Sequence, residues 1–253
     1  MVVAGVVDPN AARVRAMFTR IARRYDIMNT IMTGGRHHAW RRLAAGAVVG
    51  APPGPVLDLA TGTGDLALAV RAVRPSSMVV GVDFSEGMLS QARPKLARRR
   101  ETRVPLLAAD ALALPFRDRV FAAVTSAFVV RNLVDLARGL AEMRRVTMPG
   151  GLVVTLDITR PRVPGWDRVF GIYFHRIVPI IGTLVVGDRA AYTYLPESVE
   201  RFASPPGLAD AMRRAGLRDV RYRRFGFGTI ALHVGVVAYR PGDVDSFAAP
   251  SAD

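Results

Sequence analysis

The segment Val56-Leu57-Asp58-Leu59-Ala60-Thr61-Gly62-Thr63-Gly64-Asp65 decides the fold of this chain. It opens with a short apolar run, which is too short for a helix and is typical of a buried strand. Asp58 interrupts that run, and an acidic side chain inside a buried strand needs a partner or a ligand. Gly62 and Gly64 follow, where the backbone can turn sharply and approach a ligand closely. Asp65 then begins a helical run, so we interpret the segment as strand, turn and helix around a small ligand.

A second acid narrows the kind of ligand. Residues 78–83 form another apolar segment, which ends in Asp83 about 20 residues beyond the glycines, the spacing at which an acid binds a ribose in nucleotide-binding folds. A dinucleotide fingerprint has a third glycine where this chain has Ala67, and alanine is small enough to serve there. The glycines alone therefore leave a dinucleotide and S-adenosylmethionine as alternatives.

Apolar segments alternate with helical patterns along the middle of the chain. This alternation favours an α/β fold with a doubly wound, mostly parallel, seven-stranded sheet. Its expected strands cover residues 56–60, 78–83, 104–109, 120–126, 152–158, 220–225 and 230–239. Ligands of such sheets bind outside the carboxyl ends of the strands. Among the residues that lie at or just beyond such ends are four charged ones, Asp58, Asp83, Asp110 and Arg131.

The expected helices follow from apolar spacing and capping residues. Ser85 is a suitable cap for a helix that Pro94 is expected to kink or end. Further helices are expected from residue 11, over residues 133–146 and over residues 208–215.

The chain divides into a main domain and two other segments. Residues 1–50 precede the first strand and are either a helical lid or a packing extension, with residues 1–10 frayed. Residues 51–240 form the main domain, which begins with a Pro- and Gly-rich linker at residues 51–55. Residues 241–253 are expected to be a disordered tail.

Residues 160–200 form an insertion after the fifth strand that is more apolar than a linking helix needs. They either cover an apolar substrate, or dip into a membrane interface, or form ordinary core. No uninterrupted run of 18 apolar residues occurs, so we expect no membrane span, and the N-terminus has no signal-peptide pattern.

Composition limits the chemistry further. The 253 residues include no cysteine, which excludes disulfides, thiolate metal sites and cysteine nucleophiles. No histidine spacing typical of a metal site occurs, so we expect no metal. The formal net charge is +14, and Lys95 is the one lysine among 35 basic residues. This charge reflects either a compositional bias towards arginine or an anionic partner, and we favour a membrane surface over nucleic acid because no nucleic-acid-binding signature accompanies it.

These motifs together resemble those of the class I S-adenosylmethionine methyltransferases, which have a Rossmann-like fold. Within that class, the chain resembles the ubiquinone/menaquinone-biosynthesis C-methyltransferases of the UbiE/MenG type from about Phe18 to Tyr239. The motifs that carry the resemblance are Phe18-x-x-Ile21-Ala22-x-x-Tyr25-Asp26-x-Met28-Asn29, Trp40-Arg41, Asp58-Leu-Ala-Thr-Gly-Thr-Gly-Asp65, Asp83-Phe-Ser-Glu-Gly-Met-Leu89, Asp110-Ala-Leu-Ala-Leu-Pro-Phe116, Phe128-x-x-Arg131-Asn132, Pro149-Gly-Gly151, Tyr192-x-Tyr194-Leu-x-Glu-Ser198 and Ala231-Leu-His233-x-Gly235.

The resemblance implies S-adenosylmethionine as cofactor and three sets of site residues. The expected cofactor-binding residues are Asp58, Thr61, Gly62, Thr63, Gly64, Asp83, Phe84, Asp110, Ala111 and Ala127. The expected substrate-binding residues are Asn29, Phe128, His175, Tyr194 and His233. The expected catalytic residues are Arg131, Asn132, Tyr25 and Asp26.

The resemblance also implies the reaction, which is methylation of a ring carbon of a polyprenyl quinol such as demethylmenaquinol. Arg131 stays charged, so it suits stabilisation of a phenolate rather than proton removal. Asp26, His175 and His233 are the candidate bases. Val129 and Val130 stand where the family usually has glycine and leucine, so another phenolic or secondary-metabolite acceptor is the alternative. A nicotinamide-dependent oxidoreductase and a nucleic-acid binder are the competing classes.

Partners and location follow from the same reading. We expect a polyprenyl quinol substrate and no nucleic acid. An anionic membrane surface and a second copy of the chain are further candidate partners. The expected location is the cytoplasm, including the inner face of the membrane.

Overall fold

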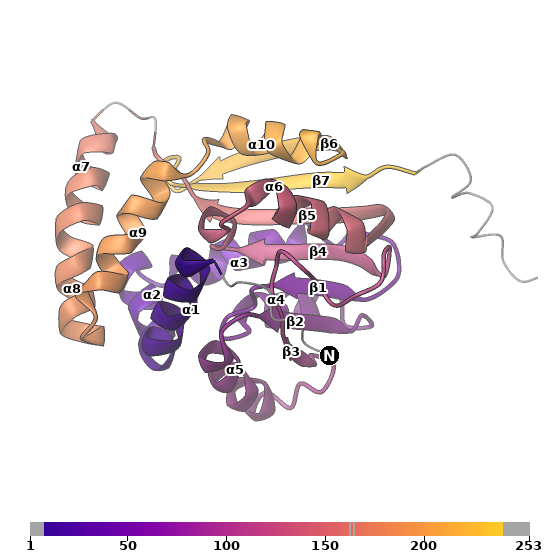
Figure 1. Ribbon diagram of the computed structural model, residues 1–253, viewed down its shortest axis with the longest axis horizontal. Helices are drawn as coiled ribbons and strands as arrows, with labels where there is room; N and C mark the ends of the chain where they lie inside the picture. Colours follow the sequence, from indigo (N-terminus) through magenta and orange to yellow (C-terminus); the bar gives the residue numbers. More distant parts are fainter. Residues whose placement is uncertain (1–7, 162, 164, 240–253) are drawn as a thin grey trace, which may run out of the picture.

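A seven-stranded sheet forms the centre of the structure, a computed structural model that describes residues 8–161, 163 and 165–239 (Figure 1). The strand order is β3-β2-β1-β4-β5-β7-β6. β7 pairs antiparallel with both neighbours, and the other pairings are parallel. The strands are β1 (Val56–Leu59), β2 (Val79–Asp83), β3 (Leu106–Ala108), β4 (Phe121–Ala127), β5 (Thr147–Ile158), β6 (Leu217–Phe225) and β7 (Ile230–Val237). The expected mostly parallel sheet is confirmed.

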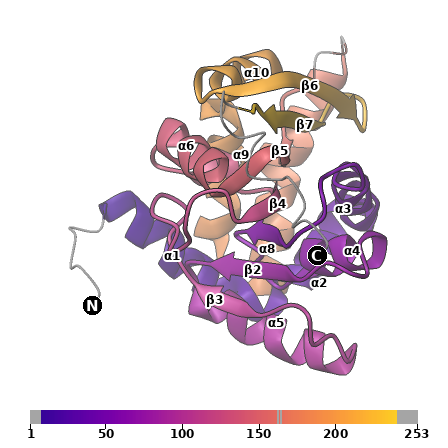
Figure 2. The same cartoon turned by 90° about the vertical axis from the view of Figure 1, so that its right-hand side faces the viewer.

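Helices cover both faces of this sheet. Figure 2 shows α3 and α4 on one side of the strands and α6 and α10 on the other. The helices are α1 (Pro9–Ile21), α2 (Tyr25–Thr33), α3 (Arg36–Gly46), α4 (Asp65–Val73), α5 (Glu86–Arg98), α6 (Leu136–Val146), α7 (Trp166–Ile172), α8 (Val178–Val186), α9 (Arg189–Arg201) and α10 (Pro205–Arg214), with a π-helical turn (Tyr173–Ile177) between α7 and α8.

Alternation along each strand builds two cores. Successive side chains of a strand point to opposite faces, so Val56 packs into the core shared with α3 and α4, while Leu57 packs into the core shared with α6 and α10. Both residues are fully buried. This burial on both faces explains why the central strands are largely apolar, and Asp58 is a buried exception that lines the cofactor side of the sheet.

A third core lies at one end of the sheet, where α1 and α2 meet α7, α8 and α9 (Figure 1). Met17 and Met28 of the first pair pack with Phe174, Val178 and Tyr192 of the insertion. We call α1 and α2 the lid. The structure corrects the expected division at residue 50, because α3 packs on the sheet beside α4 instead of joining the lid.

One further expectation was wrong in part, and another stays a prediction. Pro94 does not end its helix, because it lies inside α5, which continues to Arg98 with Ala92 and Leu96 buried against the sheet side of the helix. The expectation of no membrane span stays a prediction, because among the described residues one helical span, Arg168–Val186, is long and apolar enough to cross a membrane by length and composition alone. Residues 1–7 and the expected tail at 241–253 lie outside the described residues.

Leu140 of α6 and Leu184 of α8 allow a buried leucine to be compared with an exposed one. Leu140 is fully buried and Leu184 of α8 is 79% exposed. We expect Leu140→Ala to lower the free energy of unfolding by about 2–5 kcal/mol, because it leaves a cavity in the core. Leu184→Ala should change it by less than about 0.5 kcal/mol. Urea denaturation of the two variants measures both values, and equal losses would contradict this packing.

Candidate active site

A narrow cavity lies at the carboxyl ends of β1, β2 and β4, and we call it the cofactor cavity. All expected cofactor residues except Gly64 line it, which are Asp58, Thr61, Gly62, Thr63, Asp83, Phe84, Asp110, Ala111 and Ala127. Gly64 instead has a left-handed φ of 86° and precedes α4, so its role is to let the turn enter the helix. The lid also contributes, because Ala11, Val14 and Phe18 of α1 cover the cavity.

Asp83 holds the glycine turn through its carboxylate. Its Oδ2 accepts a hydrogen bond from the Gly62 amide at 2.8 Å, and its Oδ1 accepts one from the Ser85 amide at 2.9 Å. Burial raises the pKa of Asp83 to about 6, against the effect of these amide donors. A carboxylate oxygen can accept more than one hydrogen bond, so both oxygens keep capacity for a ligand hydroxyl.

Asp58 lies below the same turn. Its two carboxylate oxygens accept hydrogen bonds from the hydroxyls of Thr61 at 2.7 Å and Thr125 at 2.9 Å. Burial raises the pKa of Asp58 to about 6 as well. Asp58 therefore anchors the turn to β4 and also faces the cavity. The sequence indicated that this acid needs either a partner or a ligand, and the structure is compatible with both.

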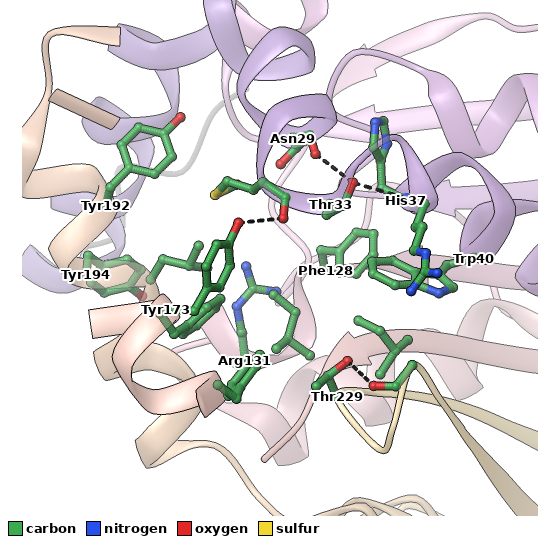
Figure 3. Close-up of a pocket in the computed structure, with 18 of the residues that line it drawn as sticks. Asn29, Thr33, His37, Trp40, Phe128, Arg131, Tyr173, Tyr192, Tyr194 and Thr229 are labelled. Carbon is green, nitrogen blue, oxygen red and sulfur yellow. Dashed lines mark hydrogen bonds between the residues drawn. The ribbon is translucent and has the colours of Figure 1, made fainter. Parts of the chain in front are cut away.

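A larger cavity of about 420 Å³ lies between the lid, the insertion and the end of the sheet. We call it the aromatic cavity. Figure 3 shows Arg131 within it, between Tyr173 on one side and Phe128 on the other. Its other aromatic lining residues are Phe18, Tyr25, Trp40, Trp166, Phe170, Phe174, Tyr192, Tyr194 and Phe227. Expected residues Asn29 and Asn132 also line it.

The two cavities share four lining residues, Phe18, Tyr25, Phe128 and Asn132. Two polar groups lie at this junction, the hydroxyl of Tyr25 and the side-chain amide of Asn132. The Oδ1 of Asn132 accepts from the Tyr194 hydroxyl at 3.3 Å, while its buried Nδ2 has no hydrogen-bond partner among the residues that the structure describes. An unpaired buried amide donor is costly unless a ligand completes it. Phe128 has a positive φ of 65°, which is strained for a bulky residue and typical of functional positions.

Arg131 is fixed by a buried carboxylate that sequence reasoning missed. Its Nη1 lies 2.5 Å from Asp157 Oδ1, its amide donates to Asp157 Oδ2 at 3.2 Å, and its Nε donates to Ser198 at 3.3 Å. The two side chains are 6% and 2% exposed. The signal was an acid near the end of an apolar strand, the pattern that identified Asp58.

Besides Gly64, three expected residues lie outside both cavities. Asp26 forms an ion pair with Lys95 and accepts from the Thr63 hydroxyl at 2.6 Å, so its carboxylate is engaged by α5 and the glycine turn. His175 is half exposed and pairs with Glu200 at 3.0 Å. His233 is buried in β7, where its Nε2 lies 2.9 Å from the Pro205 carbonyl. The structure therefore does not bring these three side chains to either cavity, and their roles as base or substrate contact stay predictions.

Arg41 and His37 of α3 belong to the site without having been assigned a role. Arg41 is buried in the wall of the cofactor cavity, donates to His37 Nδ1 and stacks on Phe128 at 5.2 Å. Burial and the neighbouring Arg41 lower the pKa of His37 to about 4, so it is neutral. His37, His38 and Asp65 come within 4.8 Å of one another. Arg41 contacts His37 and Lys95 contacts Asp65, and the positive charges of these two side chains disfavour a metal ion at this cluster.

Comparisons with known proteins agree with this geometry. The family model described as the ubiE/COQ5 methyltransferase family matches residues 6–237. The chain belongs to this family. The demethylmenaquinone methyltransferase of Thermus thermophilus is 46% identical over 219 residues, which is 87% of this chain and 99% of the relative. The ubiquinone/menaquinone biosynthesis C-methyltransferase UbiE of Methylobacterium nodulans is 40% identical over 232 residues, or 90% of this chain and 92% of the relative.

Solved structures share the fold of this family at low sequence identity. An S-adenosylmethionine-dependent methyltransferase of Aquifex aeolicus has a TM-score of 0.60 at 18% identity, covering 84% of this chain and 98% of its own. The [4+2]-cyclase SpnF has a TM-score of 0.67 at 17% identity, covering 93% and 99%. Since the latter is called a cyclase, the fold alone does not define the reaction. Family membership does, and this ubiE/COQ5 family member is a methyltransferase that uses S-adenosylmethionine.

The donors and acceptors of the cofactor cavity fit that cofactor. Carboxylate oxygens suit its ribose hydroxyls, and a buried guanidinium suits its carboxylate. The cavity holds only about 110 Å³, below the roughly 300 Å³ at which pockets for ligands of this size begin. The residues of the lid that cover it therefore have to move when the cofactor enters.

The raised pKa of Asp83 predicts a pH dependence of cofactor binding. Its carboxylate is the form that accepts ribose hydroxyls, so a proton taken up below pH about 6 has to leave before binding. We expect the affinity for S-adenosylhomocysteine to fall as pH drops through about 6. Asp83→Asn should weaken binding at pH 7.5 by about ten- to a hundredfold.

Isothermal titration calorimetry between pH 5 and 8 measures both effects. Asp210→Asn on α10 is the control, because Asp210 is exposed and pairs only with Arg213 in the described structure. An affinity that is constant from pH 5 to 7.5, or unchanged in Asp83→Asn, would rule out Asp83 as the ribose acceptor.

Proposed function

We propose that this methyltransferase moves the methyl group of S-adenosylmethionine to a ring carbon of a polyprenyl quinol, such as demethylmenaquinol. The observation that carries the proposal is the aromatic cavity, which meets the cofactor cavity at shared residues. An aromatic-lined cavity suits a flat quinol ring, and the junction lets a ring carbon face the sulfonium methyl. The names of its relatives at 40–46% identity support the same acceptor.

The cofactor residues divide by chemistry. The Asp83 carboxylate accepts the two ribose hydroxyls. Asp110 accepts from the adenine amino group, while the Ala111 amide donates to a ring nitrogen. Thr63 and the buried Arg41 hold the methionine end, where the guanidinium balances the carboxylate. These assignments rest on the residues that line the cofactor cavity.

The transfer forms a carbon–carbon bond, breaks the sulfur–methyl bond and releases the ring proton, leaving S-adenosylhomocysteine and the methylated quinol. Loss of a quinol hydroxyl proton makes the ring carbon a better nucleophile. Arg131, held by Asp157, stabilises the phenolate that results, and Asn132 Nδ2 donates to a ring oxygen. Tyr25 lies at the junction of the cavities and positions the ring.

The protein lacks a suitable carboxylate base at this place, as far as the described residues go. Asp26 is paired with Lys95, and Asp157 is paired with Arg131. His37 is neutral but has both nitrogens in hydrogen bonds, with Arg41 and Thr30. Burial raises the pKa of Tyr192, so its hydroxyl stays protonated and cannot take up the phenol proton. The phenol proton therefore leaves to water, and Arg131 favours that step by lowering the pKa of the quinol.

An assay with labelled donor and a panel of reduced quinols tests the acceptor. Methyl transfer to the ring carbon of demethylmenaquinol is the expected result, located by mass spectrometry of the product. Transfer to a non-prenylated phenol and not to any quinol would favour the alternative of a secondary-metabolite acceptor. Val129 and Val130, beside the shared Phe128, are where such a difference in acceptor would arise.

Arg131 provides the sharpest test of the mechanism. Arg131→Ala should lower kcat about 10²–10³-fold, because it removes the charge that stabilises the phenolate, with S-adenosylhomocysteine affinity nearly unchanged. Arg201→Ala on α9 is the control, since Arg201 is exposed and pairs with Glu197. The double variant with Asp157→Asn removes the stranded buried charge, so it separates catalysis from folding. A loss of cofactor affinity without a loss of kcat would contradict this role.

We further propose that the protein works from the cytoplasm at an anionic membrane surface. Helices α7 and α8 and the π-helical turn between them expose Val169, Ile172, Ile177, Ile180 and Leu184, and Phe227 is exposed near the same cavity wall. Exposed Arg168 and Arg176 lie among these apolar side chains. Apolar groups with interspersed cations suit an anionic leaflet, and a polyprenyl tail left in the bilayer would reach the aromatic cavity past Trp166 and Val169.

Vesicle binding tests this surface. The protein should sediment with phosphatidylglycerol-containing vesicles more than with phosphatidylcholine vesicles, and binding should weaken with salt. Ile180→Asp and Leu184→Asp should reduce sedimentation without changing turnover on a short-chain quinol. Equal sedimentation of the wild type and both variants would count against a membrane contact. A dimer seen in solution that the same variants dissociate would assign the face to a second copy.

A further inference from the structure

Lys95 is the one lysine in a chain with 35 basic residues, and it contacts neither cavity. It belongs to α5, and its Nζ lies 2.5 Å from Asp26 Oδ2, 2.7 Å from Asp65 Oδ1 and 3.0 Å from Thr63 Oγ1. The lysine side chain is 24% exposed. These contacts join three separate parts of the molecule, which are the lid, the glycine turn and α5.

The geometry explains why lysine stands here in an arginine-rich chain. An ammonium group has three N–H donors on one atom, and the three oxygens use all of them. A guanidinium is planar and presents its donors as a fork, which does not suit three oxygens gathered around one point. The donor directions are also consistent, because the Thr63 hydroxyl gives its proton to Asp26 Oδ1 at 2.6 Å and accepts from Lys95.

Lys95 places a positive charge between a carboxylate of the lid and a carboxylate next to the glycine turn. Asp26 and Asp65 approach the same nitrogen, so without Lys95 two carboxylates would face each other across the lid and the turn. Burial alone would raise the pKa of Asp65, but Lys95 and Arg41 outweigh it and hold that pKa below its usual value. Asp65 is therefore charged in the closed arrangement, and the Lys95 ammonium both bridges it to Asp26 and balances its charge.

Movement of the lid is required by the size of the cofactor cavity. Phe18 of α1 and Tyr25 of α2 cover both cavities, and Asp26 is the next residue along α2. Thr63 both lines the cofactor cavity and belongs to the cluster. The cluster therefore links the segment that must open to a residue that meets the cofactor.

We propose that Lys95 is a positioning residue that couples closure of the lid to the cofactor-binding turn by bridging Asp26 to Thr63 and Asp65. The proposal rests on the proposed placement of the cofactor in the cavity that Thr63 lines. It also replaces the expected role of Asp26 as a base with a role as the lid's half of this contact. The positively charged bridge forms when the lid closes and breaks when it opens.

Binding measurements test the coupling. Lys95→Met should weaken S-adenosylhomocysteine binding by about tenfold or more, within the range of known coupling between sites. Lys95→Arg keeps the charge and should recover only part of the affinity. Asp26→Asn should cause a similar loss, and the double variant Asp26→Asn/Lys95→Met should be no worse than either single one, because both remove one interaction. Arg93→Met on the same helix is the control, since Arg93 forms an exposed pair with Glu86.

The single lysine also provides a direct probe of closure. An amine-reactive reagent can modify only Lys95 and the N-terminal amine, so the N-terminus serves as an internal reference within each sample. S-adenosylhomocysteine should slow the labelling of Lys95 several-fold, and Asp26→Asn should speed it, both followed by peptide mass spectrometry. Labelling rates that neither the ligand nor Asp26→Asn changes, or full additivity of the two losses in the double variant, would overturn the proposal.

Neither experiment uses an acceptor, so the outcome is independent of whether a quinol is the substrate. An inactive quinol panel with slowed labelling would remove the acceptor assignment and leave the coupling. Absence of any S-adenosylhomocysteine binding to the wild type would instead remove the cofactor placement on which the coupling rests.

Discussion

The site depends on two carboxylates that are buried at the ends of neighbouring parallel strands. Asp58 is the third of the four residues of β1 and Asp83 is the last residue of β2, and both are almost fully buried. A buried carboxylate without partners would cost several kcal/mol, so each is surrounded by hydrogen-bond donors from the same turn. Thr61 and the Gly62 amide thus receive their positions from the acids. The turn is shaped by groups that also line the cofactor cavity.

The packing next to the turn has little freedom as a result. Gly81 of β2 pairs with Asp58 in register. A Cβ there would come within 2.8 Å of Leu106 and 3.1 Å of Thr61, so a larger residue would push the turn away from Asp83. The sheet sets the positions of the two acids, and the lid and insertion then complete the site above them. Tyr173 ties these two covers together by donating to the Met32 carbonyl at 2.7 Å.

Local patterns in the sequence predicted the parts of the site that are local in the chain. The strand, turn and helix around Asp58, and the acid that ends β2, follow from apolar runs and glycine positions within about 30 residues. What the sequence could not show were pairings between distant residues. Asp26 meets Lys95 across 69 positions, and Arg131 meets Asp157 across 26. Without those partners, Asp26 is indistinguishable from a free base.

The histidines show the same limit of what the sequence can predict. His175 and His233 were candidates because imidazole is a common base, yet a residue type carries no information about which way it faces. His233 alternates inward on β7 and meets the Pro205 carbonyl, whereas His37 reaches the aromatic cavity from α3. Only the packing of α3 on the sheet, which the sequence did not separate from the lid, brings His37 and Arg41 to the site.

The electrostatics of the two acids connect stability to function. Each has a pKa near 6 in the folded protein, above the 3.8 of an exposed carboxyl. For a raised pKa, the stabilising contribution of the group is complete below about pH 4 and is lost as pH rises through about 6. At neutral pH the free protein therefore holds two carboxylates whose burial opposes folding. Ligand hydroxyls donated to Asp83 would offset part of that cost, so the folded turn and the bound cofactor stabilise each other. The arrangement that makes the free turn less stable is the one that makes it selective for a diol.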